Sequence, residues 1–516
     1  MTRAHTALLL LAVAACAPDT QAEHGETLRV DVVGSFDPKA SRTVLDGPRA
    51  VLNDSTQLGL VDLDSAGQIV PGLATSWRVN DDGLGIIFRL RPIKWPDGRN
   101  VLARDAVTTF RRIAAPDSQH PLKPMLDRIV NASAVGVGRK SQASLGISDP
   151  LPTIVDVRLS TPQPALLQLL ADQSTSILRQ GDFPPPLGAF TVINAVSRPL
   201  HLARNPGYFD AGNVALAGVS LLPIDDPVAA IARFRRGETD VVIGNGIAGL
   251  GEARTVADQR TLQLDPTYGV YGYLANTRRG PLADARVRRA LTMVVDRTTL
   301  VQRLFAIPAM QPVNGITPPN LPGYPEQAQP VWANWLYIER LTEARRLLTE
   351  AGYGTNRPLK VEVIITDGRE HRAVLDAVAR DWAAVGVMIK PVVLTPQYLV
   401  ESVASGAFTL ALTERRAAVD SARFFLSPFS CRPGGSYCNR QADQLLRGRR
   451  TDLDPAARAV AIRQAEQLMV DDVPMIPLFT PVRWALVSTN VTGWTSNILG
   501  AHPLSRLNKT TAAKGK

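Results

Sequence analysis

The stretch from residue 270 to residue 297 constrains the fold more than any other part of this 516-residue chain. It opens with a short apolar run, 270–274, which is typical of a buried strand. Asp284 then stands where a helix N-cap is expected, because its carboxylate can accept the first free helical N–H groups. Apolar residues recur after it at helical spacing: Val287, Ala290, Leu291, Val294 and Val295. The pattern predicts a strand, a turn and a helix with one buried face, and with its arginines turned outward: Arg286, Arg288, Arg289 and Arg297.

The later part of the chain repeats this alternation of strand and helix. Residues 359–366 and 387–394 are typical of strands, and an apolar stripe between them, from Leu375 to Trp382, has helical spacing. Such a strand–helix–strand unit joins parallel strands. A chain of 516 residues exceeds what one core usually holds, so an α/β protein with two or three subdomains is expected.

The first residues have the features of an export signal. Arg3 and His5 precede an apolar stretch, 7–15, whose small last residues stand before Cys16. This ending resembles a bacterial lipobox, so we expect residues 1–16 to be a lipoprotein-type signal peptide ending at a lipidated Cys16. Acyl chains there would hold the protein at a membrane surface in the periplasmic or extracytoplasmic space. The alternative is a plain signal peptide in which Cys16 is incidental.

Two further cysteines, Cys431 and Cys438, lie close together in CRPGGSYC. An exported chain meets an oxidising compartment, so a disulfide between them is expected. No histidine or further cysteine lies near them in sequence, and no metal site is predicted. The net charge is +10, but its basic residues are spread along the chain without interleaved aromatic residues. Nucleic acid is therefore not an expected partner.

Signals for catalysis are few. The chain has six histidines, and it contains no zinc-protease, nucleophile-elbow or phosphate-loop motif. Gly244, Gly246 and Gly249 do form a G-x-G-x-x-G pattern after an expected strand, which is the form of a dinucleotide fingerprint. The residues that follow make only a weakly amphipathic helix, and the motif lies in the middle of the chain. We expect no enzyme activity and no cofactor, with a dinucleotide-cofactor enzyme as the alternative.

The opening stretch also resembles the most recognisable segment of the family 5 solute-binding proteins, the extracytoplasmic receptors of peptide, nickel and related ABC importers. The shared features are N-T, a Pro-containing turn, D-x-R-V-R-x-A-L and a terminal D-R. Other family motifs follow the same order along the chain: G-L-V-D-L-D to S-W at 59–77, F-R-L-R-P-I-K-W-P-D-G at 88–98, R-N-P-G-Y-F at 204–209, R-G-E-T-D at 236–240 and V-P-M-I-P-L at 473–478. In PLGAF at 186–190 the first glycine of the family's G-T-G-P-Y is replaced, which puts the shape of that loop in doubt.

The resemblance implies a two-lobed periplasmic-binding-protein-like fold with an extra subdomain. Two strands should cross between the lobes, one at 270–274 and one within 477–487. Lobe I would then comprise 25–52, 186–269 and 477–507, the extra subdomain 53–185 and lobe II 270–476, with a disordered tail at 508–516. The lobes would close on a ligand and deliver it to a membrane permease served by a separate ATPase. We expect a monomer; a ligand sensor on the same fold is a further alternative.

Ligand contacts are expected at the junction of the lobes. These are Ser35 and Phe36 after the first strand, Tyr271 and Tyr273, and the segment 414–423. Peptide-binding members of the family carry G-W-x-x-D-Y, whose aspartate grips the α-amino group of the peptide; aligned on Phe425-Leu426, that position is Ala418. Asp420 could replace it only if the loop shifts by two residues. Arg415, Arg416 and Arg423 instead favour a carboxylate or other anionic group on the ligand. The alternatives are solvent-exposed arginines and core-packed tyrosines.

Overall fold

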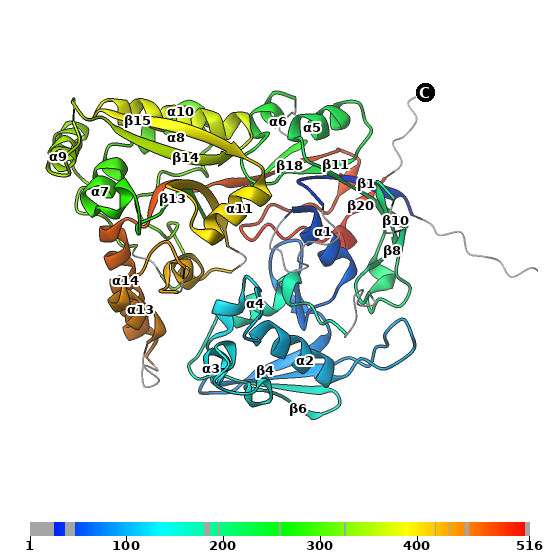
Figure 1. Ribbon diagram of the computed structural model, residues 1–516. Helices are drawn as coiled ribbons and strands as arrows, with labels where there is room; N and C mark the ends of the chain where they lie inside the picture. Colours follow the sequence, from blue (N-terminus) through cyan, green and yellow to red (C-terminus); the bar gives the residue numbers. More distant parts are fainter. Residues whose placement is uncertain are drawn as a thin grey trace, which may run out of the picture.

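Three sheets organise the chain into two lobes and a subdomain (Figure 1). The computed structural model describes residues 25–510 apart from 37–46, 180–185, 195–196, 257, 259, 325–326, 355, 418, 433 and 449–453. Cys16 and Ala418 therefore lie outside the described residues. None of the described helices is long and apolar enough to cross a membrane.

Lobe I is built on a seven-stranded sheet in the order β12-β18-β11-β1-β10-β9-β8. The central strand β1 (Thr27–Val33) runs parallel to both neighbours, and the other pairs are antiparallel. Leu28, Val30 and Val32 are fully buried, which explains why this alternating segment takes the centre. The other strands are β8 (Phe190–Asn194), β9 (Leu200–Arg204), β10 (Gly218–Ile224), β11 (Val241–Ile243), β12 (Leu262–Pro266) and β18 (Val482–Val487), with helices α1 (Gly47–Thr56), α5 (Pro227–Arg235) and α6 (Leu250–Val256).

The extra subdomain holds a four-stranded antiparallel sheet in the order β4-β5-β7-β6. In β5 (Gly85–Leu90) buried and exposed residues alternate over most of the strand, so one face packs inward against α2 (Ala103–Ala114) and the other meets solvent. A short hairpin, β2–β3, joins α1 to this sheet. The remaining elements are β2 (Val61–Leu63), β3 (Ile69–Pro71), β4 (Ala74–Val79), β6 (Ile147–Leu151), β7 (Ile154–Arg158), α3 (Ala132–Gly136) and α4 (Leu166–Ala171).

Lobe II has a five-stranded mixed sheet in the order β15-β14-β16-β13-β17. The expected strand–helix–strand unit is present, with β14 (Leu359–Thr366) and β15 (Val387–Leu394) parallel and α10 (Arg369–Ala383) between them. The sheet is only partly parallel, because β13 (Gly269–Ala275) pairs antiparallel with β16 (Leu410–Arg416) and β17 (Met475–Phe479). Its helices are α7 (Ala285–Met293), α8 (Arg297–Leu304), α9 (Tyr337–Glu350), α11 (Pro396–Ser405), α12 (Ala422–Leu426), α13 (Arg440–Arg447) and α14 (Pro455–Asp472).

The chain crosses between the lobe sheets twice, from β12 to β13 and from β17 to β18. The return comes later than the expected boundary at 477, because β17 still pairs with β13 and the lobe I strand β18 begins at Val482. The expected tail also starts with structure: β20 (Asn508–Lys509) pairs with β19 (Val491–Thr492). Residue 510 follows β20, and 511–516 lie outside the described residues.

The stretch from residue 270 to residue 297 folds as predicted in outline. Asp284 accepts a hydrogen bond from the backbone N–H of Arg286 at 2.9 Å, and all five apolar positions are buried. The expectation that all four arginines face outward is wrong for two of them. Arg288 and Arg297 are 5% and 4% exposed, whereas Arg286 and Arg289 are exposed.

Backbone carbonyls explain these two buried arginines. Arg288 donates to the carbonyls of Asp472 and Leu282, at 2.8 and 2.7 Å. Arg297 donates to the carbonyls of Pro477 at 2.8 Å and Thr292 at 2.9 Å. Burial lowers the pKa of Arg297 to about 9, with the positive charge of Arg340 acting in the same direction. Both guanidinium groups thus satisfy carbonyls at the ends of helices and strands that a shorter side chain could not reach.

Candidate functional site

The segment 414–423 lies where lobe II meets the rest of the molecule. β16 ends beside the first crossing, with Arg415 opposite Val270 and Arg416 opposite Gly269. The N–H of Ala417 then donates to the carbonyl of Tyr268 at 2.7 Å. The segment therefore leaves the lobe II sheet at the crossing and runs on toward the extra subdomain.

Arg416 and Glu414 contact the glycine-rich loop of lobe I. The side chain of Arg416 is 6% exposed, and it donates to Oδ1 of Asn245 at 2.9 Å and lies 3.6 Å from the Glu414 carboxylate. Glu414 also accepts the N–H of Ile247 at 3.3 Å. These contacts join the lobes, so Arg416 has protein partners among the described residues.

Asp420 and Arg423 contact the extra subdomain. Arg423 donates to both carboxylate oxygens of Asp127, at 3.1 and 2.6 Å. The backbone N–H of Asp420 donates to Oε1 of Gln168 at 3.0 Å. Arg423 therefore also has a protein partner where a ligand group was expected.

Arg415 is the one cation of this segment that meets no carboxylate in the described part of the chain. Its Nη2 donates to the carbonyl of Phe424 at 2.8 Å, and its guanidinium lies 4.7 Å from the centre of the Phe424 ring. Its Nε is buried without a hydrogen-bond partner. Burial, and then the positive charge of Arg432, lower the pKa of Arg415 to about 10, so the group stays protonated at neutral pH.

The expected aromatic contacts divide between core and surface. Tyr271 and Tyr273 are fully buried in the core, which is the alternative role and not the ligand-lining one. The Tyr271 ring stacks on Phe479 at 4.6 Å, and its hydroxyl lies 2.9 Å from Nδ1 of His371. Ser35 is exposed, and the half-buried ring of Phe36 lies 4.4 Å from the guanidinium of Arg49. Ser35 is therefore the one exposed residue among the expected ligand contacts that the structure describes.

The G-x-G-x-x-G loop is filled by protein groups. Glu370, on α10 of lobe II, accepts the N–H groups of Gly249 and Gly251, each at 3.0 Å. These are the positions where a dinucleotide fingerprint would hold a pyrophosphate. A Cβ on Gly244 would lie 2.3 Å from the Trp484 ring, and one on Gly246 would lie 2.5 Å from the Glu414 carboxylate. Gly244 thus allows packing against Trp484 within lobe I, and Gly246 allows the contact with Glu414 of lobe II. The interpretation of this loop as a dinucleotide fingerprint is wrong.

Four residues at these contacts carried no sequence signal: Asp127, Gln168, Glu370 and His371. Each meets a partner more than 90 residues away along the chain, so neither periodicity nor spacing could connect them. His371 is 6% exposed, and burial lowers its pKa to about 4 despite the nearby charges of Glu370 and Asp367. The histidine is therefore neutral where it meets Tyr271.

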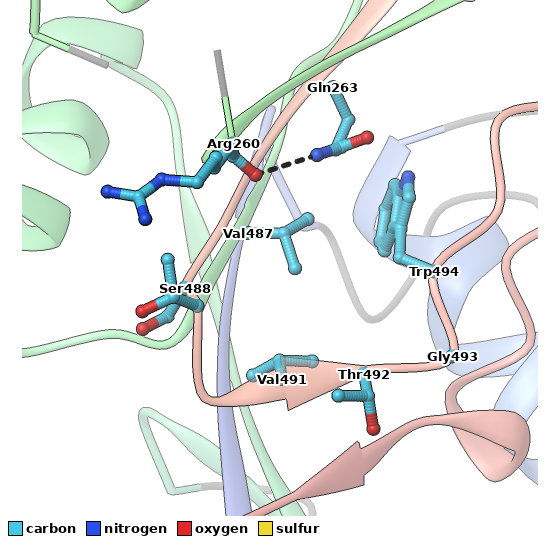
Figure 2. Close-up of a pocket in the computed structure, with 9 residues that line it drawn as sticks. Arg260, Gln263, Val487, Ser488, Val491, Thr492, Gly493 and Trp494 are labelled. Atoms are coloured by element: carbon cyan, nitrogen blue, oxygen red, sulfur yellow. Dashed lines mark hydrogen bonds between the residues drawn. The ribbon is translucent and has the colours of Figure 1, made fainter. Parts of the chain in front are cut away.

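A separate pocket of about 310 Å³ lies on lobe I, where β12 and β18 meet the β19 segment (Figure 2). Its lining includes Arg260, Gln263 and Trp494, and Gln263 donates to the carbonyl of Arg260 at 3.0 Å. None of the segment 414–423 lines it. In the described part of the chain, no group of three His, Cys, Asp or Glu side chains could hold a metal ion. Cys431 and Cys438 form a disulfide, with Cα atoms 4.4 Å apart.

Comparisons with known proteins agree with this architecture. Residues 68–436 match the model of the bacterial extracellular solute-binding proteins, family 5. The periplasmic oligopeptide-binding protein OppA of Salmonella typhimurium is 28% identical over 495 residues, which cover 92% of this chain and 89% of that protein. The murein tripeptide-binding protein MppA of Escherichia coli superposes with a TM-score of 0.84 at 25% identity, covering 95% of this chain and 99% of that one.

The arrangement of the lobes differs from that of an open relative. The unliganded open form of MppA, at 24% identity, gives a TM-score of 0.65 while covering 96% of this chain and 99% of that one. Coverage is nearly complete in both superpositions, so the lower score reflects how the parts are placed and not which parts are present. The chain thus belongs to the family 5 bacterial extracellular solute-binding proteins, and it is the substrate-binding component of an ABC importer and not an enzyme.

Proposed function

We propose that this protein captures a peptide-like or otherwise anionic solute, and that Arg415 holds a carboxylate of that solute. The observation that carries the proposal is the half-buried, protonated side chain of Arg415, whose Nε is buried without a partner and which meets no carboxylate among the described residues. A partly buried charge without a counter-ion is costly, and a ligand carboxylate would offset that cost through charge-assisted hydrogen bonds. Relatives named as oligopeptide- and murein-peptide-binding proteins support a peptide-like ligand.

The same segment argues against the usual anchor for a peptide's amino group. Ala418 stands at the position of the family's anchoring aspartate, and alanine offers no acceptor for an α-ammonium group. Asp420 is the nearest acid along the segment, and its own N–H is held by Gln168 of the extra subdomain. That contact opposes the two-residue shift by which Asp420 would reach the anchor position. We infer that recognition falls on the acidic end of the ligand.

Calorimetric titration with matched peptides tests this proposal. A mixed tripeptide library would be offered in three forms: unmodified, N-acetylated and C-terminally amidated. Amidation should weaken binding at least tenfold, because the carboxylate facing Arg415 is lost, whereas N-acetylation should leave affinity within about threefold. Arg415→Gln should remove the preference for the unmodified carboxylate; Arg346→Gln, at an exposed surface pair, is the matched control. Weaker binding after N-acetylation alone would refute the proposal.

We also propose that Cys16 anchors the exported protein to a membrane and that the protein is a monomer. The support for the anchor is the small-residue stretch before Cys16 in the sequence. In cells that produce the full chain, Cys16→Ala should move the protein from the membrane fraction to the soluble periplasmic fraction.

The proposed monomer is tested by light scattering. The purified protein should give one chain per particle, and a stable dimer would contradict this proposal.

A further inference from the structure

Four contacts join lobe II to the extra subdomain. Arg423 forms a bidentate ion pair with Asp127, and the side-chain oxygen of Gln168 accepts the backbone N–H of Asp420. Arg128 of the subdomain donates to the carbonyl of Arg447 at 3.2 Å, and Arg458 of lobe II donates to the carbonyl of Pro162 at 3.3 Å. No crossing strand runs directly between these two parts, because both crossings join lobe II to the lobe I sheet.

The contacts of Arg447 and Arg458 lie on α13 and α14, away from the crossing strands, whereas Arg423 follows the end of β16 by seven residues and lies nearer to the first crossing. In Figure 1 the subdomain, with α3 and α4, and the α13–α14 end of lobe II lie on the lower side of the molecule, whereas β11 and β18 lie on the upper side. A rotation about the crossings moves the most distant points furthest. Arg423 and Asp127 belong to lobe II and to the extra subdomain, so an opening that moves these two parts away from each other must break their ion pair.

From this geometry we propose that Asp127 and Arg423 form a latch that stabilises the closed arrangement of the lobes. The proposal rests on the solute-binding function and is independent of which ligand is bound. The side chain of Arg423 is 16% exposed and that of Asp127 is 24% exposed, so the pair is partly desolvated and stronger than an ion pair on open surface. In an open form both groups would be hydrated and separate, and the pair contributes only when the lobes are closed.

The latch gives Arg423 a role different from that of Arg415. Both terminal nitrogens of Arg423 are used on both oxygens of Asp127, which leaves the guanidinium as a positioning group for closure. The two possible roles of Arg423, binding a ligand or pairing with Asp127, differ in the effect expected when Asp127 is neutralised. If Arg423 acted on a ligand, neutralising Asp127 would not have the same effect as neutralising Arg423.

A distance measurement on ligand-free protein tests the latch. The full chain would be unfolded, freed of bound solute, refolded, and spin-labelled at the exposed positions Gln142→Cys in the subdomain and Gln444→Cys in lobe II. The proposal predicts a short-distance population without ligand. Arg423→Gln and Asp127→Asn should each lower the ratio of closed to open molecules about tenfold, which corresponds to about 1.4 kcal/mol.

The double variant completes the test. If the two residues act on each other, Asp127→Asn with Arg423→Gln should also lower the ratio only about tenfold. An additive, roughly hundredfold loss would overturn the proposal, as would the absence of a short-distance population in the parent protein or unchanged ratios in the single variants. Asp156→Asn, which breaks an ion pair inside the subdomain, is the matched control and should leave the ratio unchanged. Because no ligand is present, failure of the Arg415 proposal would not affect these outcomes.

Discussion

Replacing Gly244 with alanine should destabilise the fold because the added methyl group crowds the ring of Trp484. A Cβ at this position would lie 2.3 to 2.6 Å from three atoms of the Trp484 ring, well inside van der Waals contact. Trp484 is 1% exposed, and its Nε1 donates to the carbonyl of Ala248 at 3.2 Å, so the ring has little room to move. Gly244 does not have a positive φ, and no left-handed strain is added. Overpacking costs about 1–3 kcal/mol, and loss of the indole hydrogen bond about 1 kcal/mol more.

Substitutions of two other glycines separate the free-energy cost of steric crowding from the cost of backbone strain. Gly237 has a φ of +69° and nothing within 4 Å of an added Cβ, so Gly237→Ala should cost about 1–2 kcal/mol from left-handed strain alone. Gly212 has neither constraint, and Gly212→Ala should stay within about 0.5 kcal/mol of the parent. Urea unfolding followed by tryptophan fluorescence would rank the variants. If Gly244→Ala unfolds at the same urea concentration as Gly212→Ala, the packing role of the loop is refuted.

Three further predictions concern residues at the lobe contacts and the disulfide. His371 has a pKa of about 4 in the folded protein against an ordinary value of 6.5, so the unfolded chain binds the proton first as pH falls. The contribution of neutral His371 to the unfolding free energy should be complete above about pH 6.5 and should fall by up to about 3 kcal/mol toward pH 4. His371→Gln should remove this part of the pH dependence in thermal melts recorded across that range. Glu370→Ala leaves the N–H groups of Gly249 and Gly251 without their acceptor, and should cost about 2–4 kcal/mol and speed hydrogen exchange at both amides; unchanged exchange would contradict it. Cys431→Ser with Cys438→Ser should lower the unfolding free energy by roughly 2–3 kcal/mol, and the parent protein should gain mass on reduction with no thiol reacting beforehand.

Features determined by neighbouring residues could be predicted from the sequence. The Asp284 cap forms because its partner is two residues away, and the apolar face of α7 follows from helical spacing. The β14–α10–β15 unit follows from three segments that are continuous in sequence. Family resemblance added the two lobes, since no local pattern states that β13 and β18 belong to different sheets.

Contacts made by long side chains could not be predicted in this way. Arg288 and Arg289 are adjacent on α7, yet one is buried and the other exposed. Both side chains donate to carbonyls at the end of α14, about 180 residues further on, but Arg288 also donates to the carbonyls of Leu282 and Ala283. From its residue type alone, an arginine is predicted to lie at the surface. The carbonyl groups that allow Arg288 to be buried are brought together only when the chain is folded.

The same reasoning explains why the segment 414–423 was predicted as one anion-binding patch and is observed as three separate contacts. Arg416 turns to lobe I, Arg423 to the extra subdomain, and Arg415 to its own segment. Two of the three charges therefore meet oxygen atoms across the junction, where they contribute when the lobes are together. Under the two proposals, specificity depends on Arg415 and closure on Arg423, within one segment. An Arg415 substitution should change which solutes bind, whereas an Arg423 substitution should lower the affinity for all solutes by a similar factor. A change of selectivity on substitution of Arg423 would contradict this division of roles.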